Sequence, residues 1–274
     1  MKKIQGGCLL DHLQFLNEIY PDRHKMAPIF DIATPFKMDQ EAQNSILPPD
    51  LKKRKRKRKR QAVDKPFSAL ELRMQKMLSH LFTNQESPPK ELILDNNKKA
   101  RNSAMQCMSE ATEHYPNSDI CGQNSNAHLI EMTIKDRIYI LPPKSEFLSM
   151  NVQSCLAPLE NRKFQAILMD PPWQNKHVKR QKMLCKSYKM LENDDIFSQL
   201  PNMNLLLQDN GFLFIWCTNS SRHFEAIQSW LQKWDLQMKT VWYWLKVTKF
   251  GETVTPWNHP HKKPYERLGK IFNT

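Results

Sequence analysis

The sequence predicts a doubly wound α/β domain in its second half, preceded by a largely disordered region with short helices. After residue 129, apolar runs rich in β-branched and aromatic residues alternate with amphipathic segments of helical period. Before residue 135 the chain is mostly polar and lacks such periodicity. Strand, helix, strand, helix and strand in this order favour parallel strands joined by right-handed crossovers.

Composition divides the chain into five parts. The first is loosely ordered apart from one short helix that ends before Pro21. The third is a helix, because Ser68 and Glu71 form a capping box ahead of apolar residues at helical spacing. The parts are a loose segment at 1–50, a basic run at 51–61, a helix at 66–82, a polar linker at 83–128 and the α/β domain at 129–274.

The positive charge of the chain is concentrated in one place. Lys52 to Arg60 is an unbroken run of nine basic residues, and without it the net charge of +13 falls to +4. Such a run repels itself and must stay solvated. We expect a nuclear-import signal that an import receptor reads, which predicts the nucleus as the location and the cytoplasm as a second compartment. A tether for nucleic-acid phosphates and a plain solvated spacer are the alternatives.

Cysteine, glycine and apolar patterns argue against several classes of protein. The six cysteines lie far apart without a C-x-x-C pair, so neither a disulfide framework nor a zinc site is indicated. The six glycines form no G-x-G turn, which argues against kinases, NTPases and dinucleotide oxidoreductases. No apolar run reaches the roughly 18 residues that span a membrane, so we expect a soluble intracellular protein.

The elements of the second half follow one another closely. Alternation of apolar and polar residues predicts a first strand before Asp136, and the second strand after it stops at Pro142 and Pro143. Thr218 to Ser221 offer side chains that cap a following helix. The further elements are a helix at 194–200, a strand buried on both faces at 212–217, a helix at 221–231 and a strand at 238–247.

The most informative stretch is the apolar run from Phe164 to Met169, which ends in Asp170-Pro171-Pro172-Trp173. The run predicts a central strand buried on both faces, with Asp170 at its carboxyl end, where open α/β sheets bind ligands. Both prolines lack an N–H, so their carbonyls are rigid acceptors beside the carboxylate. Acceptors next to an exposed indole suit a flat base with an amino group, such as adenine or cytosine.

A basic loop follows this motif. It contains Lys176, Lys179 and Arg180 with few carboxylates nearby. Cations directly behind a base-binding residue can hold the phosphates that flank a target nucleotide. The loop therefore predicts contact with nucleic acid, either RNA or DNA.

At this point the chain resembles a family. Asp170-Pro171-Pro172-Trp173 matches the catalytic tetrapeptide of the adenine-N6 methyltransferases, which use S-adenosylmethionine. Flanking blocks at 139–145, 174–180 and 261–266 are similar to one branch of that family. The resemblance runs from about Asp136 to Glu266 and implies a Rossmann-like methyltransferase sheet.

The resemblance also implies roles for individual residues. Asp170, Pro171, Pro172 and Trp173 would be catalytic, and Lys262 and Lys263 would join the basic loop in binding nucleic acid. Histidines 259 and 261 lack a third ligand, so no metal is implied. A proline-terminated strand is an equal alternative for Pro143, Lys144 and Ser145, and a solvated strand end is the alternative for Lys246. The implied cofactor contacts are Asp170, Pro143, Lys144, Ser145, Lys246, His261 and Glu266.

The resemblance fails after Glu266. Family members continue through further strands, one directly after the glutamate, whereas this chain reads Arg267 to Thr274 and stops. We therefore expect a sheet that is incomplete at its carboxyl end and a weakened cofactor pocket.

The main hypothesis is an N6-adenine methyltransferase whose substrate is RNA, with small nuclear RNA favoured and adenosine or 2′-O-methyladenosine as the target. DNA adenine is the second choice. A catalytically silent paralogue that binds nucleic acid and a scaffold with a disordered amino half are the remaining alternatives. On the main hypothesis, Asp170 lies outside the apolar core and Trp173 faces an open groove.

Overall fold

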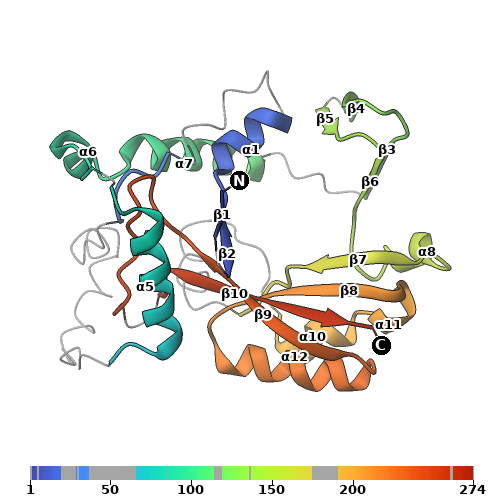
Figure 1. Ribbon diagram of the computed structural model, residues 1–274. Helices are drawn as coiled ribbons and strands as arrows, with labels where there is room; N and C mark the ends of the chain where they lie inside the picture. The colour runs from blue at the N-terminus through green and yellow to red at the C-terminus, as the bar shows by residue number, and fades with distance from the viewer. Residues whose placement is uncertain are drawn as a thin grey trace, which may run out of the picture. The chain divides into compact units, whose positions relative to one another are not determined.

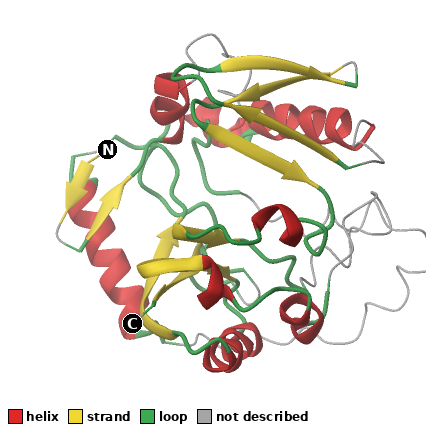
Figure 2. Cartoon of the chain, turned by 90° about the vertical axis from the view of Figure 1, so that its right-hand side faces the viewer, coloured by secondary structure: helices red, strands yellow, loops and turns green. Residues whose placement is uncertain are grey.

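The computed structural model describes residues 2–4, 6–19, 29, 31–36, 66–84, 86–113, 119–135, 137–174, 191–259 and 262–273 (Figure 1). Contacts divide the chain into two compact units. The first comprises residues 1–109 and 244–265, and the second comprises residues 110–243 and 266–274. The chain combines helices with strands (Figure 2), so the predicted α/β class is confirmed.

The second unit is built around a four-stranded sheet in the order β7-β8-β10-β9. The strands are β7 at Phe164–Met169, β8 at Leu207–Cys217, β9 at Gln237–Leu245 and β10 at Tyr265–Phe272. β7 and β8 are parallel, as the sequence predicts, with Met169 opposite Ile215. β10 runs antiparallel to β8, so the sheet is mixed.

Three helices accompany the sheet and lie below it in Figure 1: α10 at Asn193–Ser198, α11 at Met203–Leu206 and α12 at Ser221–Lys233. One face of β8 packs on them because Leu213, Ile215 and Cys217 alternate with less buried residues. α12 contributes Ile227 and Leu231, which lie one turn apart on one side of the helix. The predicted side-chain cap of α12 is wrong, since Ser220 is its N-cap without a side-chain hydrogen bond.

The predicted burial of β7 is also wrong. β7 lies at an edge of the sheet and pairs with β8 alone. The side chain of Leu168 is 65% exposed, whereas Ile167 and Met169 pack against the core. An apolar run thus forms an edge strand with one open face rather than a central strand. Of these two strands, β8 is the one inside the sheet, although its second face is only half buried.

The carboxyl end of the described chain differs from the expectation of missing strands. Tyr265–Phe272 forms β10, which inserts between β8 and β9 and begins beside Glu266. Ile271 is fully buried in the core of the unit. Alternation of Leu268, Gly269, Lys270 and Ile271 is the pattern of a strand with one buried face. The strand that was expected to be absent after the glutamate is therefore present.

Two antiparallel pairs of strands precede the sheet in the second unit. β4 at Ile130–Ile134 pairs with β5 at Arg137–Leu141, as predicted. β3 at Ile120–Asn124 pairs with β6 at Ser145–Ser149, and a short helix α8 follows at Leu156–Leu159. The buried amide of Asn124 donates to the carbonyl oxygens of His128, Leu141 and Pro142. These bonds tie the β3 end to the β5–β6 turn.

The first unit contains more structure than the sequence suggests. It has β1 at Lys2–Ile4, β2 at Gly7–Leu9, α1 at His12–Ile19 and α5 at Ala69–Leu81, whose Ser68–Glu71 capping box is present. The segment predicted as a polar linker, residues 83–128, contains α6 at Lys90–Asp95, α7 at Lys98–Glu113, which ends in the second unit, and β3 of the second unit. The basic run from Lys52 to Arg60 lies outside the described residues. Among the helices described, none is long and apolar enough to cross a membrane.

Glu71 of α5 forms the best-buried ion pair of the first unit. Its Oε1 lies 2.8 Å from Nζ of Lys263, while its Oε2 accepts from the Ser68 backbone and hydroxyl. Burial on its own would raise the pKa of the Glu71 carboxyl. The hydrogen bonds from Lys263 and Ser68 overcome this effect, so its pKa is lowered from the ordinary 4.5. Lys263 is therefore engaged within the first unit.

We expect Glu71→Gln to lower the free energy of unfolding of the chain by about 1–2 kcal/mol at pH 7, because Lys263 loses its charged partner. A lowered folded pKa adds stability above the unfolded value of 4.5, and this stability is lost as the pH falls through the folded value. Urea titrations at about pH 7 and about pH 3 should therefore show a smaller pH effect in Glu71→Gln than in the wild type. Exposed Glu86→Gln serves as the control, and equal pH effects in all three proteins would contradict the assignment.

Candidate active site

The Asp170 motif lies at the carboxyl ends of the parallel pair β7 and β8. Met169 is the last residue of β7 and lies opposite Ile215, so the turn runs alongside Trp216 and Cys217. Asp170 is exposed at this edge. Because parallel strands end together here, side chains from different segments can meet around one ligand. The position of the carboxylate suits a ligand-binding role.

Trp173 is not the exposed stacking surface that the sequence suggests. Its side chain is only 4% exposed and belongs to the core of the second unit. The indole Nε1 donates to the backbone oxygen of Trp216 at 2.8 Å, and the ring lies against Phe197 and His223 with centroids 5.8 and 5.0 Å away. An apolar ring whose N–H finds a buried partner is more stable inside than in water. Trp173 therefore anchors the turn to β8.

The two proline carbonyls are partly used by the turn itself. The Pro171 oxygen accepts the backbone N–H of Trp173 at 2.8 Å, and the Pro172 oxygen accepts from the backbone of Leu191 at 3.5 Å. A carbonyl oxygen has two lone pairs, so Pro171 retains an acceptor position for a further donor. The turn that carries Asp170 and Pro171 is thus held at its far end by Trp173.

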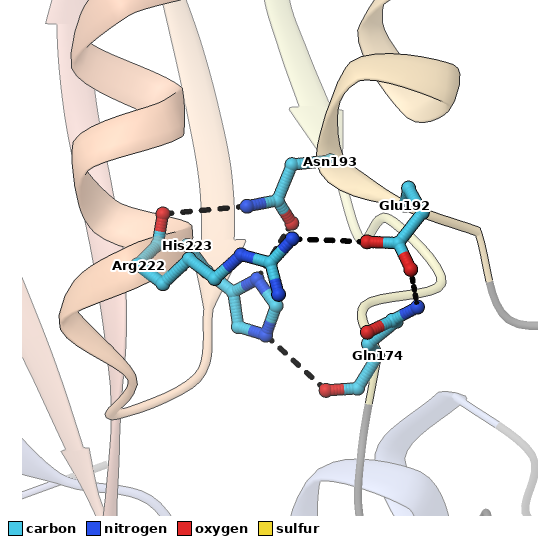
Figure 3. Close-up of polar contacts among 5 residues, drawn as sticks. All are labelled: Gln174, Glu192, Asn193, Arg222 and His223. Atoms are coloured by element: carbon cyan, nitrogen blue, oxygen red, sulfur yellow. Dashed lines mark hydrogen bonds and ion pairs between the residues drawn. The ribbon is translucent and has the colours of Figure 1, made fainter.

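A polar cluster that the sequence does not reveal holds the residue after the motif (Figure 3). The ring of His223, in the first turn of α12, is 5% exposed. Its Nδ1 lies 2.7 Å from Oδ1 of Asn193 in α10, and its Nε2 lies 3.2 Å from the backbone oxygen of Gln174. The amide nitrogen of Asn193 donates to the backbone oxygen of Arg222 at 3.3 Å. Two helices and the motif turn therefore meet at one imidazole.

The outer part of this cluster is exposed. Glu192, the N-cap of α10, accepts from the guanidinium of Arg222 at 3.0 Å and from the side-chain amide of Gln174. Exposed ion pairs contribute little to stability, so we assign this layer an orienting rather than a stabilising role. No spacing rule could have found these contacts, because Gln174, Glu192 and Arg222 are brought together only by the packing of α10 on α12.

Two ionisable groups near the motif are neutral at physiological pH. Burial lowers the pKa of His223, and this effect exceeds the opposing effect of the Gln174 backbone oxygen. Burial also raises the pKa of the Cys217 thiol to about 11, against the smaller opposite influence of Arg267. Cys217 is therefore a protonated thiol, which is a poor nucleophile. Asp170 is the carboxylate that the motif presents.

The turn between β5 and β6 holds three of the residues expected to contact a cofactor. The ammonium of Lys144 donates to the backbone oxygen of Ser125 at 2.6 Å, and the Ser145 hydroxyl donates to the oxygen of Pro142 at 2.6 Å. Lys144 has a positive φ of 51°, as tight turns often require. The side chains of Lys144 and Ser145 therefore stabilise their own turn, and nothing in these contacts points to a ligand.

The remaining expected site residues are distributed over both units. Glu266 is exposed at the start of β10 in the second unit. Lys246, Lys262 and Lys263 belong to the first unit, where the backbone N–H of Lys246 donates to the oxygen of Pro264 at 2.8 Å. The other four residues, Lys176, Lys179, Arg180 and His261, lie outside the described residues.

A search for groups of three metal-ligating side chains among the described residues finds none. The arrangement around Asp170 provides an exposed carboxylate, a carbonyl acceptor and a buried anchor. Such a set accepts hydrogen bonds from a ligand that carries an amino group.

Comparison with known proteins supports a functional role for the region around Asp170. Residues 164–269 match the MT-A70 family. The chain is 39% identical over 149 residues to the human N(6)-adenine-specific methyltransferase METTL4. The aligned region covers 53% of this chain and 30% of that protein. The chain is 30% identical over 209 residues to the Pyricularia oryzae N6-methyladenosine RNA methyltransferase MTA1, covering 70% of this chain and 51% of that protein.

A third relative is named as an enzyme that acts on DNA rather than RNA. The chain is 24% identical over 293 aligned positions to a Caenorhabditis elegans DNA N6-methyl methyltransferase, covering 95% of this chain and 76% of that protein. The chain thus spans less than a third of the human relative and about half of the fungal one.

Proposed function

We propose that the chain, whose residues 164–269 match the MT-A70 family, is the catalytic part of an adenine-N6 methyltransferase acting on nucleic acid. RNA is the favoured substrate, with small nuclear RNA first among its classes and adenosine or 2′-O-methyladenosine as the target. The single observation that carries the proposal is the exposed Asp170 carboxylate at the carboxyl end of β7, followed by a turn anchored in the core through Trp173.

The proposed role of the turn is to orient the amino group of adenine. The Asp170 carboxylate and the Pro171 oxygen would accept its two N–H bonds, which favours a pyramidal nitrogen with its lone pair directed at the donor methyl. The anionic Asp170 would also stabilise the positive charge that develops on nitrogen during transfer. A fixed orientation of this kind can supply much of the rate enhancement. Trp173 would position the turn instead of stacking on the base.

S-adenosylmethionine, when bound, would supply the electrophilic methyl group. The acceptor chemistry of Asp170 fits this group, since a carboxylate at the carboxyl edge of the sheet can accept from its amino or hydroxyl donors. Glu266, which lies in the same unit as Asp170, is proposed to hold the rest of it. We retain Pro143, Lys144 and Ser145 only as backbone contacts, because the polar side chains of this turn are already hydrogen-bonded locally.

The substrate is proposed from chemistry that RNA and DNA share. Lys176, Lys179, Arg180 and Lys262 would contact phosphates, while Lys263 would take part only if its ion pair with Glu71 opens. Relatives named as RNA and as DNA methyltransferases support both substrates. The RNA relative is the more similar in identity, which favours RNA.

The function is tested by incubating the full chain with radiolabelled S-adenosylmethionine and matched oligonucleotides. One RNA and one DNA strand of identical sequence carry a single adenosine, and a third strand carries 2′-O-methyladenosine. We expect N6-methyladenosine in RNA, identified by mass spectrometry of nucleosides. Calorimetry with millimolar cofactor separates the alternatives, since nucleic-acid binding without cofactor binding or methylation would favour a catalytically silent protein.

We also propose that the protein acts in the nucleus through an import receptor that reads the basic run. A fluorescent fusion of the full chain should accumulate in nuclei, and replacing Lys52 to Arg60 by glutamine should lower the nuclear-to-cytoplasmic ratio severalfold, because the receptor then has no cations to bind. Equal distributions of the two fusions would contradict the proposal. A fusion in which Lys98 and Lys99, outside the run, are replaced is the control.

A further inference from the structure

We propose that His223 is a positioning residue for the Asp170 turn, which its ring contacts at Trp173 and at the backbone oxygen of Gln174. This inference rests on the proposed function, because the turn is the part of the molecule to which methyl transfer is assigned. His223 lies outside the motif, 49 residues after Gln174 in the chain, and would not touch the substrate.

The ring is held in one orientation by its other neighbours. Oδ1 of Asn193 faces Nδ1 of His223 at 2.7 Å. The direction of this amide is set because its nitrogen donates to the backbone oxygen of Arg222, and the reverse orientation would oppose two oxygens. With Nδ1 fixed by α10, Nε2 can only point toward Gln174. The imidazole therefore links the turn to the first turns of two helices.

The same ring also supports the anchor of the turn. Its centroid lies 5.0 Å from that of Trp173, at an interplanar angle of 38°. Trp173 is in turn bonded to β8 through Trp216. The turn is thus held from two directions, by β8 through the indole and by α12 through the imidazole. Asp170 and Pro171 lie at the other end of this short turn, so its fixation determines where their acceptor oxygens lie.

A purely space-filling residue would not need these partners. Both Asn193 Oδ1 and Gln174 O are acceptors, so the neutral imidazole donates through Nδ1 to Asn193 and lies in contact with Gln174, and only a protonated ring would donate to both. Burying a polar ring costs free energy unless its nitrogens are hydrogen-bonded, whereas a leucine would fill this part of the core without that cost. The contribution of the histidine over leucine is therefore the bond to Asn193, which fixes the ring against the turn.

Three full-length variants test the inference. His223→Leu fills the core but lacks a donor. His223→Gln carries a side-chain amide that reaches the position of Nε2 and can donate to Gln174 without protonation. Ile227→Val, one turn further along the buried face of α12, costs about 0.5–1.5 kcal/mol in the same core without facing the turn. It is the control for loss of global stability.

The first measurement is hydrogen exchange of the backbone amides of Trp173 and Gln174 by mass spectrometry. We expect exchange about tenfold faster in His223→Leu, near wild-type exchange in His223→Gln and no change in Ile227→Val, because local opening follows local contacts. Equal exchange in His223→Leu and the wild type, or an equal rise in Ile227→Val, would overturn the inference. If His223→Leu fails to fold, Asn193→Ala, which frees the ring, should give the same rise in exchange.

The second measurement is kcat and KM for the methylated oligonucleotide. We expect kcat to fall by about 10- to 100-fold in His223→Leu with KM changed less than about threefold, since a misplaced turn costs orientation more than binding. His223→Gln should recover most of the loss, and failure of this rescue alongside normal exchange would overturn the inference. A wild-type chain without methyl transfer would refute the proposed function, while hydrogen exchange would still decide whether His223 holds the turn.

Discussion

Replacing Asp170 by asparagine is expected to lower methyl transfer by about 100- to 1,000-fold, the range seen when one preorganised polar contact to a reacting group is lost. Asparagine has nearly the same shape but presents an amide N–H₂ where a carboxylate oxygen accepted a hydrogen bond. It also removes the negative charge that would stabilise the developing cation on the amino group. The measurement is incorporation of labelled methyl into the adenosine-containing RNA strand.

The fold should survive this change. Asp170 is exposed at the end of β7, so its replacement removes no core packing and should alter the free energy of unfolding by less than about 1 kcal/mol. Asp209→Asn is the matched control, because Asp209 is an exposed carboxylate in the same sheet, within β8. Near-normal turnover in Asp170→Asn, with Asp209→Asn also active, would show that the carboxylate is not the acceptor that we propose.

The second large effect concerns stability. Trp173→Ala is expected to lower the free energy of unfolding by about 3–5 kcal/mol, because it removes a buried aromatic ring and leaves the Trp216 carbonyl without its indole donor. This is a large part of the roughly 5–15 kcal/mol that stabilises an ordinary domain. Urea unfolding followed by circular dichroism measures the change.

Trp173→Phe separates packing from hydrogen bonding. It keeps most of the aromatic contact with Phe197 and His223 but lacks the N–H, so a loss of about 1–3 kcal/mol is expected. An indole that stacks on a substrate base from an exposed position predicts the opposite pattern, with lost methylation and unchanged unfolding in both variants. If Trp173→Ala unfolds at the same urea concentration as the wild type, the result would therefore support the stacking role of the indole.

Trp173 illustrates why the sequence predicted the site only in part. The order of aspartate, two prolines and tryptophan indicates rigid acceptors at a strand end, and the turn does follow β7. Whether the indole then points outward or into the core depends on Trp216 and Phe197, 43 and 24 residues further along the chain. Local sequence patterns carry no information about such partners.

The same limit applies to the sheet. Apolar runs correctly located β7, β8 and β9, and the capping box correctly located α5. The exposure of Leu168 was missed, since an apolar run looks the same in an edge strand as in a central one. β10 was not predicted, because the sheet was expected to be shortened. The residues around Ile271 nevertheless alternate between buried and less buried positions, as in a strand.

By itself, the sequence determined that the second half forms an α/β sheet and that a carboxylate with rigid neighbours ends one of its strands. Periodicity and backbone-restricted residues suffice for this, because both act over a few neighbouring positions. Only the tertiary structure decided that Trp173 is an anchor, that β10 lies between β8 and β9, and that His223 and Asn193 support the motif. These outcomes depend on pairing and packing between segments that are far apart in the sequence, where many partners are possible and burial selects one.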